Sequence, residues 1–384
     1  MKNKLIFKTT LLSIGILNVM GGAAVAPALS KIAQEFSQFD QTLIKLVISL
    51  PALFVIFTST IISIFVKNTS KKKILIIGLI LYAIGGVGGI YSPNLFILLT
   101  FRAITGIAIG LIMPISLSLI ADYYQKDEKK KMMGFMNAIG NLGGMIMMIL
   151  SGFIANFSWR LSFSVYLSSI LVFIPVLIFI PFKNHVTLEN NNKIKLPKKT
   201  IRYVLGALLS MLFFYLLPTN MSLYIAQQKL GSTGIAGLSL GAVTLAVFFI
   251  GLFFVKLFHW LKRIFLPSAI LMITIGFLLL SYANSLILVF LACILIGISF
   301  GIIMPYLINE LSDQVSPQLA NKAMAIITVG IFLGQFLSPF FQKLLIFIFQ
   351  LKSIKSIFFT SSFFLLSIFV FIFVKSLTHS DKMK

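Results

Sequence analysis

Long runs of apolar residues recur along the 384-residue chain and constrain its fold more than any other feature. Crossing a membrane takes about 20 apolar residues in a helix, because the hydrocarbon core is about 30 Å thick. Twelve stretches meet this condition, at residues 6–28, 43–66, 74–91, 96–120, 132–155, 161–181, 203–225, 236–255, 264–283, 286–310, 323–341 and 355–374. Since backbone groups in lipid must be hydrogen-bonded internally, the pattern predicts an all-α integral membrane protein.

Two stretches need interpretation. The first begins with basic residues and ends in Ala24-Val25-Ala26, like a secretory signal, but Pro27 would then be the first mature residue. We therefore expect an uncleaved first helix. The eleventh stretch, 323–341, is interrupted by Ser338-Pro339, and a second apolar segment, 344–351, follows it before Lys352.

Composition excludes several classes of function. Hydrophobic residues make up 59% of the chain and charged residues 11%, too few to cover a soluble domain. The net charge of +23 does not indicate nucleic-acid binding, because the basic residues form short runs between apolar stretches. Cys293, the single cysteine, allows no internal disulfide. We find no phosphate-binding loop, nucleophile arrangement or metal-ligand cluster, and so expect neither an enzyme nor a cofactor or metal.

The basic residues also predict orientation and domain boundaries. If the N-terminus is cytoplasmic, 24 of the 32 Lys and Arg residues lie on the cytoplasmic side, which favours a cell (inner or plasma) membrane protein with both termini inside. The longest polar interval divides the spans six and six. We predict an N-terminal bundle at 1–181, a cytoplasmic linker at 182–202 and a C-terminal bundle at 203–384.

The two halves contain an internal repeat at an offset of 191 residues, which relates Leu98–Asp122 to Val289–Asp313. The matched pairs are Gly106 with Gly297, Gly110 with Gly301, Pro114 with Pro305, and Asp122 with Asp313. Glycines four apart let a neighbouring helix approach closely, and the prolines allow a bend. Either these residues serve packing alone, or they let helices that line a pathway rock during transport. A parallel duplication of six helices is typical of one large transporter class.

At these residues the chain resembles the major facilitator superfamily, specifically its twelve-helix drug-efflux-like members. Arg102-Ala-Ile-Thr-Gly106 through Pro114 to Asp122 resembles that family's span 4 motif. Ala26-Pro27-Ala28-Leu29 resembles the end of its first span, and Ser158-Trp159-Arg160 the junction of spans 5 and 6. The resemblance implies two six-helix bundles related by a parallel pseudo-two-fold axis and a role for Arg102 in proton coupling.

The chain departs from the family pattern at two places. In the loop between spans 2 and 3, Lys67 stands where the family usually has aspartate, so a latch between the halves would need other partners. In span 5, Gly140, Gly144 and Gly152 are present, but Met147-Met148 replaces the Gly-Pro of the antiporter signature. The second departure weakens assignment to an antiporter.

Polar residues inside spans are candidates for function, because they are costly in lipid. Arg102 could hold an anion, tune a neighbour or stabilise the bundle through carbonyls, and Glu310, beside Tyr306 and Asn309, could contact substrate or a proton. Asp122 could be a helix cap or a latch. The uncharged candidates are Asn18, Asn137, Asn141, Tyr215, Asn220 and Gln335, each of which could instead bond between helices.

We therefore predict a monomeric secondary transporter that lies in the lipid bilayer, binds a small molecule and does not bind nucleic acid. The leading hypothesis is alternating-access export of an amphipathic or drug-like molecule, with protons as coupling ion. The alternative is uptake or facilitated transport of a small metabolite such as a sugar, an organic acid or an amino-acid-like compound, which the altered span 5 and the lack of a deep carboxylate favour.

Overall fold

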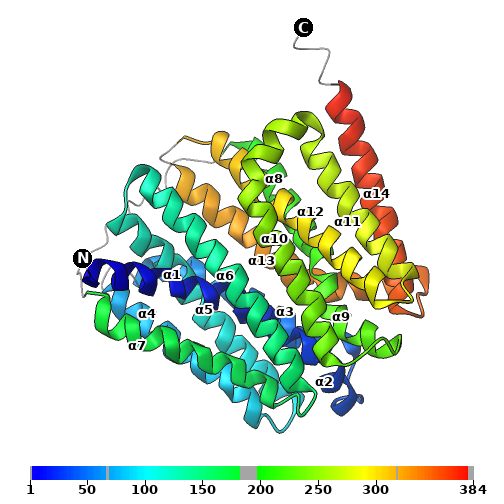
Figure 1. Cartoon of the computed structure of the whole chain (residues 1–384), viewed down its shortest axis with the longest axis horizontal. Coiled ribbons are helices and arrows are strands. Elements are labelled where there is room, and N and C mark those ends of the chain that lie inside the picture. Colours follow the sequence, from blue (N-terminus) through cyan, green and yellow to red (C-terminus); the bar gives the residue numbers. More distant parts are fainter. Residues whose placement is uncertain (1, 66–68, 182–196, 317–318, 379–384) are drawn as a thin grey trace. The chain divides into compact units, whose positions relative to one another are not determined.

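A computed structural model describes residues 2–65, 69–181, 197–316 and 319–378, and within these ranges the regular structure is entirely helical. The chain divides into two compact units, Met1–Lys195 and Leu196–Lys384, each a bundle of long helices (Figure 1). The predicted boundaries of the linker, 182–202, stay a prediction, because residues 182–196 lie outside the described ranges.

The first unit contains the helices that precede the linker. Its elements are α1 (Lys2–Ala23), η1 (Ala26–Ala28), α2 (Leu29–Glu35), α3 (Gln41–Phe65), α4 (Lys71–Val87), η2 (Gly88–Tyr91), α5 (Leu95–Tyr123), α6 (Lys126–Ala155), η3 (Leu161–Ser168) and α7 (Ser169–Phe179). Side-chain caps fix two of the helix starts. Ser70 accepts a hydrogen bond from the backbone N–H of Lys73 at the start of α4, and Asn94 accepts one from Ile97 at the start of α5.

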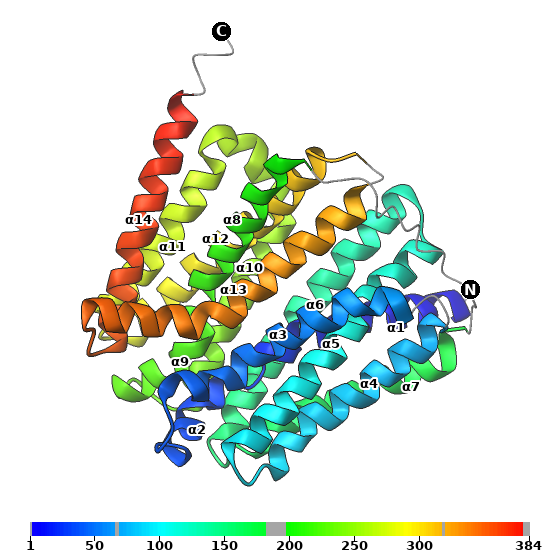
Figure 2. The ribbon, with the colours of Figure 1, turned by 180° about the vertical axis from the view of Figure 1, so that it is seen from behind.

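The second unit contains the remaining helices (Figure 2). Its elements are η4 (Lys198–Thr200), α8 (Ile201–Phe214), α9 (Leu216–Gln227), α10 (Thr233–Leu261), η5 (Lys262–Ile264), α11 (Phe265–Tyr282), α12 (Leu286–Asp313), α13 (Ala320–Phe349) and α14 (Ile354–Thr378). One core cluster joins α8, α11, α12 and the start of α13, with Phe265 and Leu311 fully buried in it.

Ten helical segments of the described ranges are long and apolar enough to cross a membrane, or eleven if the bent pair Leu5–Leu17 and Gly21–Glu35 is one span. One segment, Thr233–Tyr282, has 50 residues and would extend about 75 Å as a straight helix, far more than the membrane requires. It holds both α10 and α11, and the chain reverses direction between them (Figure 1). If α10 and α11 are counted as two spans and the bent pair as one, the total is the predicted twelve.

Several spans differ from the uninterrupted helices that hydropathy predicts. The first span bends by 46° and separates into α1 and α2, the sixth begins as the 3-10 helix η3, and the seventh breaks at Tyr215 between α8 and α9. The prediction for the eleventh span was wrong, because α13 continues through Pro339 to Phe349. A helix in lipid tolerates proline, since no water competes for the backbone groups and neighbouring helices hold the chain in place.

The repeated glycines lie where two helices touch in each unit. A Cβ added at Gly106 of α5 would lie 2.3 Å from the carbonyl oxygen of Pro51 in α3, and one at Gly297 of α12 would lie 2.4 Å from that of Val243 in α10. Gly110 and Gly301 continue the same two interfaces. Helices α5 and α12 both run on through Pro114 and Pro305. Each unit therefore holds a closely packed helix pair at equivalent positions of the repeat.

Candidate functional site

Arg102 is fully buried on α5 and donates hydrogen bonds to three other spans of the first unit. Its Nε lies 2.6 Å from the carbonyl oxygen of Val47 in α3, and one terminal nitrogen lies 2.7 Å from that of Gly21 and 3.0 Å from that of Gly22 in α1. The other terminal nitrogen lies 2.8 Å from the hydroxyl oxygen of Tyr166 in η3. The guanidinium thus connects spans 1, 2, 4 and 6.

The acceptors around Arg102 arise from the bend of the first span. The last carbonyl groups of a helix have no N–H partner within it, and α1 ends at Ala23, so Gly21 and Gly22 lie in its last turn. A cation at this end also interacts favourably with the helix dipole. Tyr166 donates to the Gly21 carbonyl oxygen at 3.2 Å, and Tyr82 donates to that of Leu17 at 3.3 Å. Three side chains of other helices therefore hold the bent first span.

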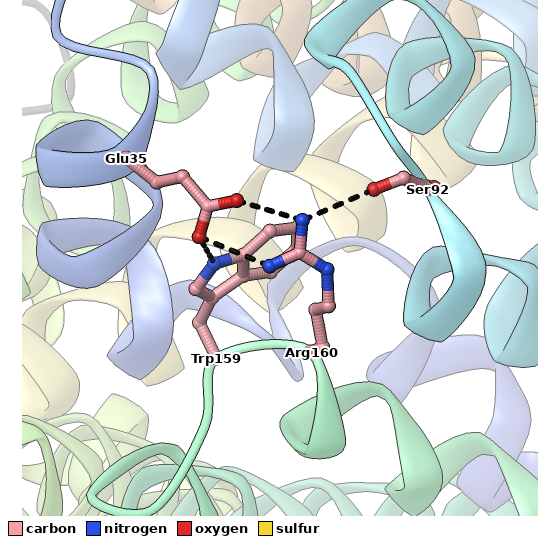
Figure 3. Close-up of polar contacts among 4 residues, drawn as sticks. All are labelled: Glu35, Ser92, Trp159 and Arg160. Atoms are coloured by element: carbon pink, nitrogen blue, oxygen red, sulfur yellow. Dashed lines mark hydrogen bonds and ion pairs between the residues drawn. The ribbon is translucent and has the colours of Figure 1, made fainter.

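A second polar cluster joins α2 to the loops that precede α5 and η3 (Figure 3). Glu35, the last residue of α2, accepts hydrogen bonds from both terminal nitrogens of Arg160, at 2.7 and 3.0 Å, and from the indole nitrogen of Trp159. Arg160 also donates to the carbonyl oxygen of Ser92 at 3.4 Å, and its guanidinium lies over the Trp159 ring. This bidentate pair ties α2 to the segments that precede α5 and η3.

An ion pair with a buried lysine joins the start of α4 to the end of α5, on the side that the sequence predicts to be cytoplasmic. The Nζ of Lys71, the first residue of α4, lies 2.5 Å from Oδ2 of Asp122 in the last turn of α5. The Lys71 side chain is 5% exposed and the Asp122 side chain 40%. Asp122 thus has a partner within its own unit. Lys67, predicted to alter the latch, lies outside the described residues.

Replacing Asp122 with asparagine should lower the free energy of unfolding by about 1–2 kcal/mol, because the buried Lys71 ammonium loses its counter-charge while the exposed side of the pair limits the cost. Thermal unfolding of the purified protein in detergent measures the change. Asp127→Asn is the matched control, since Asp127 and Lys130 form a pair that is almost fully exposed, and we expect no measurable shift. Equal shifts for the two variants would contradict the prediction.

The second unit has a reciprocal amide pair in its interior. Asn220 of α9 donates to the Gln342 side-chain oxygen at 3.0 Å, and Gln342 of α13 donates to the Asn220 side-chain oxygen at 3.0 Å. Both side chains are buried. Nearby, the Ser338 hydroxyl donates to the carbonyl oxygen of Leu212 in the last turn of α8 at 2.9 Å. Span 11 therefore holds span 7 on both sides of its break.

Glu310 lies half-buried near the end of α12, opposite the start of α8. The hydroxyl of Tyr203 lies 3.5 Å from its Oε2, and Arg202 donates to the same hydroxyl at 2.5 Å. Tyr306, one turn before Glu310, packs against Phe258 and Phe265. The carboxylate is thus connected through one hydroxyl to an exposed arginine.

The other predicted residues occupy varied places and do not form one cluster. Asn137 is exposed and Asn141 half-buried on α6, where Gly140, Gly144 and Gly152 are buried. Tyr215 is buried at the break between α8 and α9, and Gln335 has a weak contact with the sulfur of Met211, 3.7 Å away. Asn309 and Asp313 are exposed at the end of α12. The side chain of Asn18 lies outside the described residues.

Sequence reasoning missed several residues of these clusters. Gln342 and Ser338 escaped notice because Ser338-Pro339 suggested the end of a helix, and Glu35 because it follows the first span. A signal was present for Gln342, since Gln335, Ser338 and Gln342 are spaced three and then four apart and share a helix face. Within the described ranges, no three His, Cys, Asp or Glu residues lie close enough to hold a metal ion.

Comparison with known proteins extends these observations. The sequence profile of the Major Facilitator Superfamily matches residues 11–339. The quinolone resistance protein NorA of Staphylococcus aureus (strain MSSA476) is 28% identical over 286 residues, which cover 70% of this chain and 72% of that protein. Another relative, the uncharacterized transporter SPAC750.02c of Schizosaccharomyces pombe, is 28% identical over 157 residues, 40% of this chain and 32% of that protein.

Solved structures share the fold at low sequence identity. A bacterial homologue of the human lysosomal transporter Spinster, in an inward-facing and unoccupied conformation, superposes with a TM-score of 0.76 at 15% identity and covers 98% of this chain and 97% of its own. The nucleoside transporter NupG superposes with a TM-score of 0.78 at 13% identity, with coverage of 96% and 99%.

Proposed function

Because this chain belongs to the Major Facilitator Superfamily, we propose that it exports a small amphipathic or drug-like molecule by alternating access, coupled to protons. Membership establishes the coarser part of this statement, since the chain is a multi-pass membrane transporter with a small-molecule substrate and not an enzyme. The finer part, which covers substrate class, direction and coupling, is our proposal. So are a cell-membrane location with both termini in the cytoplasm, a monomeric state and the two-bundle domain boundaries.

The observation that carries the export proposal is the match to a quinolone resistance protein along 286 residues, since it covers more than two thirds of both chains. The character of the spans supports it. The polar side chains buried in the second unit near the break of span 7 are amides and hydroxyls, namely Asn220, Gln342 and Ser338, rather than charges. A mostly apolar surrounding with a few polar groups suits an amphipathic solute.

Proton coupling requires a group that can gain and lose a proton, and the carboxylates of this chain leave few choices. Of the nine Asp and Glu residues of the chain, Glu310 alone is half-buried among those that the structure describes. Arg102 cannot serve, because a guanidinium stays protonated. We propose that Glu310 is the coupling group, with Tyr203 in contact with its carboxylate and Arg202 in contact with the Tyr203 hydroxyl.

Replacing Glu310 with glutamine should remove the response of transport to a pH gradient while leaving exchange of substrate across the membrane intact. Glutamine keeps the size of the side chain and its hydrogen bond to Tyr203 but carries no exchangeable charge. The measurement is flux of a fluorescent cationic dye in proteoliposomes, with and without an imposed pH gradient. In the variant, the rate with the gradient should fall to the rate without it.

Glu128→Gln is the matched control, because Glu128 is an exposed glutamate in the first turn of α6 and should leave the gradient response unchanged. A Glu310→Gln variant that still responds to the gradient would exclude Glu310 as the coupling group. A wild-type protein that moves dye but ignores the gradient would refute proton coupling as a whole, and lack of dye flux in the wild type would count against drug export.

A second candidate function is uptake or facilitated transport of a small metabolite. One observation favours it. Helix α6 runs for 30 residues from Lys126 to Ala155 without proline, because Met147-Met148 stands where the antiporter pattern has Gly-Pro. Counterflow of labelled metabolites in the same proteoliposomes separates the two candidates. A uniporter exchanges its substrate without a pH gradient and does not transport the dye.

A further inference from the structure

Aromatic side chains pack the turn of the hairpin between α10 and α11 in the second unit. Phe254 and Phe258 of α10 pack against Phe265 of α11, each with ring centroids 5.3 Å apart from it. Lys262 turns the chain with a φ of 43°, a conformation that a lysine adopts only where its surroundings hold it. Three aromatic rings and one tight turn thus fix the direction in which the neighbouring side chains point.

The outer face of this hairpin changes from apolar to basic along α10. Leu252, Phe253 and Val255 are exposed, and Trp260, two turns further on, is 77% exposed. Phe253, Lys256 and Trp260 are spaced three and then four residues apart and so share one side of the helix. Leu252 and Trp260 are separated by about 12 Å along the helix, at a rise of 1.5 Å per residue, and Lys256 lies between them.

Four basic side chains surround the tip of the hairpin and are all exposed, namely Lys256, His259, Lys262 and Arg263. The sequence has no Asp or Glu between Glu189 and Glu310, so no neighbouring carboxylate is available along the chain. None of the ion pairs in the described residues involves these four side chains. The tip therefore presents uncompensated positive charge next to an exposed indole ring.

We propose that this hairpin binds the headgroup of an anionic phospholipid, with the phosphate at Lys256, Lys262 and Arg263 and the acyl chains along Leu252, Phe253 and Val255. The order of the groups matches the ligand. Tryptophan favours the interface between headgroups and acyl chains, and cations beside it attract anionic lipid. A soluble anion would match the charges but would leave the exposed apolar face and Trp260 unexplained. The site concerns lipid, and it is independent of the substrate and direction of transport.

Trp260 provides a direct test, because the chain has two tryptophans and the other, Trp159, is buried in the first unit. The protein is placed in lipid nanodiscs that contain equal mole fractions of phosphatidylglycerol and phosphatidylcholine, with bromine on the acyl chains of one or the other. Bromine quenches tryptophan fluorescence on contact. The same measurement on Trp260→Phe gives the Trp159 signal, which is subtracted.

Brominated phosphatidylglycerol should quench Trp260 more strongly than brominated phosphatidylcholine, with a local enrichment on the order of fivefold for each cation that meets the phosphate. The triple variant Lys256→Gln, Lys262→Gln, Arg263→Gln should quench equally with both lipids. The matched control neutralises three basic residues of the first unit, Lys129, Lys130 and Lys131, and should keep the preference. Equal quenching in the wild type, or a preference that survives the triple substitution, would overturn the proposal.

Two further arms keep the result decisive. If the triple variant fails to fold, high ionic strength replaces it, because screening should remove most of the wild-type preference. Inorganic phosphate is added at constant ionic strength in the other arm. Loss of the preference there would assign the site to a free anion and overturn the lipid proposal, whereas an unchanged preference supports it.

Discussion

Substitution of Arg102 by methionine should abolish transport and lower the free energy of unfolding by about 3–5 kcal/mol, because several buried carbonyl groups lose their donor at once. Methionine fills the apolar volume but donates no hydrogen bond. The carbonyl groups of Val47, Gly21 and Gly22 would then lose their donor inside the bundle, and each such loss costs about 1–3 kcal/mol where no partner replaces it. Thermal unfolding in detergent and dye export from cells measure the two effects.

Two further variants help to explain the effect of the methionine substitution. Arg102→Lys keeps the charge but cannot reach carbonyl groups of two helices and a hydroxyl at once, so its stability should be intermediate. Cys293→Ala at the equivalent position of the repeat is the control, and we expect a loss of about 1 kcal/mol or less. A methionine variant that unfolds like the wild type yet does not transport would show that Arg102 acts in the transport cycle rather than in holding the spans together.

Breaking the amide pair of the second unit should have the next largest effect. Gln342→Leu deprives Asn220 of a donor and an acceptor at once, and the free energy of unfolding should fall by about 1–2 kcal/mol. Asn220→Leu should cost at least as much, because Asn220 also donates to the carbonyl oxygen of Leu216. In the double variant the second substitution should cost less than it does alone, since the first has already removed the pair.

The coupling energy from this double-mutant cycle is the decisive quantity, and thermal unfolding of the four proteins provides it. Gln335→Leu is the matched control. Gln335 lies two turns before Gln342 on the same helix, and its contact with the Met211 sulfur is long at 3.7 Å, so we expect little change. Strictly additive effects of the two pair substitutions would show that the two amides do not stabilise each other.

The sequence predicts the spans well, because hydropathy reports directly on the cost of placing a residue in lipid. Hydropathy does not predict where spans break, although proline gives a local reason at two of the breaks. Pro27 and Pro218 have no backbone N–H to donate to the carbonyl groups of Ala23 and Phe214, and α1 and α8 end at those two residues. A proline does not always break a span, since Pro339 lies within an unbroken α13. Breaks depend on which donors of other helices meet the freed carbonyl groups, and hydropathy does not contain that information.

For the candidate residues, too, the sequence predicts one part and the structure supplies the other. Arg102 was predicted from its charge alone, and its place on span 4 followed from the periodicity, but its four acceptors come from α1, α3 and η3. Asn220 was predicted as a polar residue in a span, whereas Gln342 was not, although the two meet in the structure. A polar residue inside a span can be found from sequence, but its partner can be found only once helices are packed.

The breaks of the first and seventh spans lie at equivalent positions of the internal repeat. Helix α1 ends at Ala23 and α8 at Phe214, which are separated by the repeat offset of 191 residues. The carbonyl groups of Gly21 and Leu212, equivalent by the same offset, are both occupied, the first by Arg102 and Tyr166 and the second by Ser338. The two copies therefore share the position of the break but fill the freed carbonyl groups with side chains from non-equivalent positions.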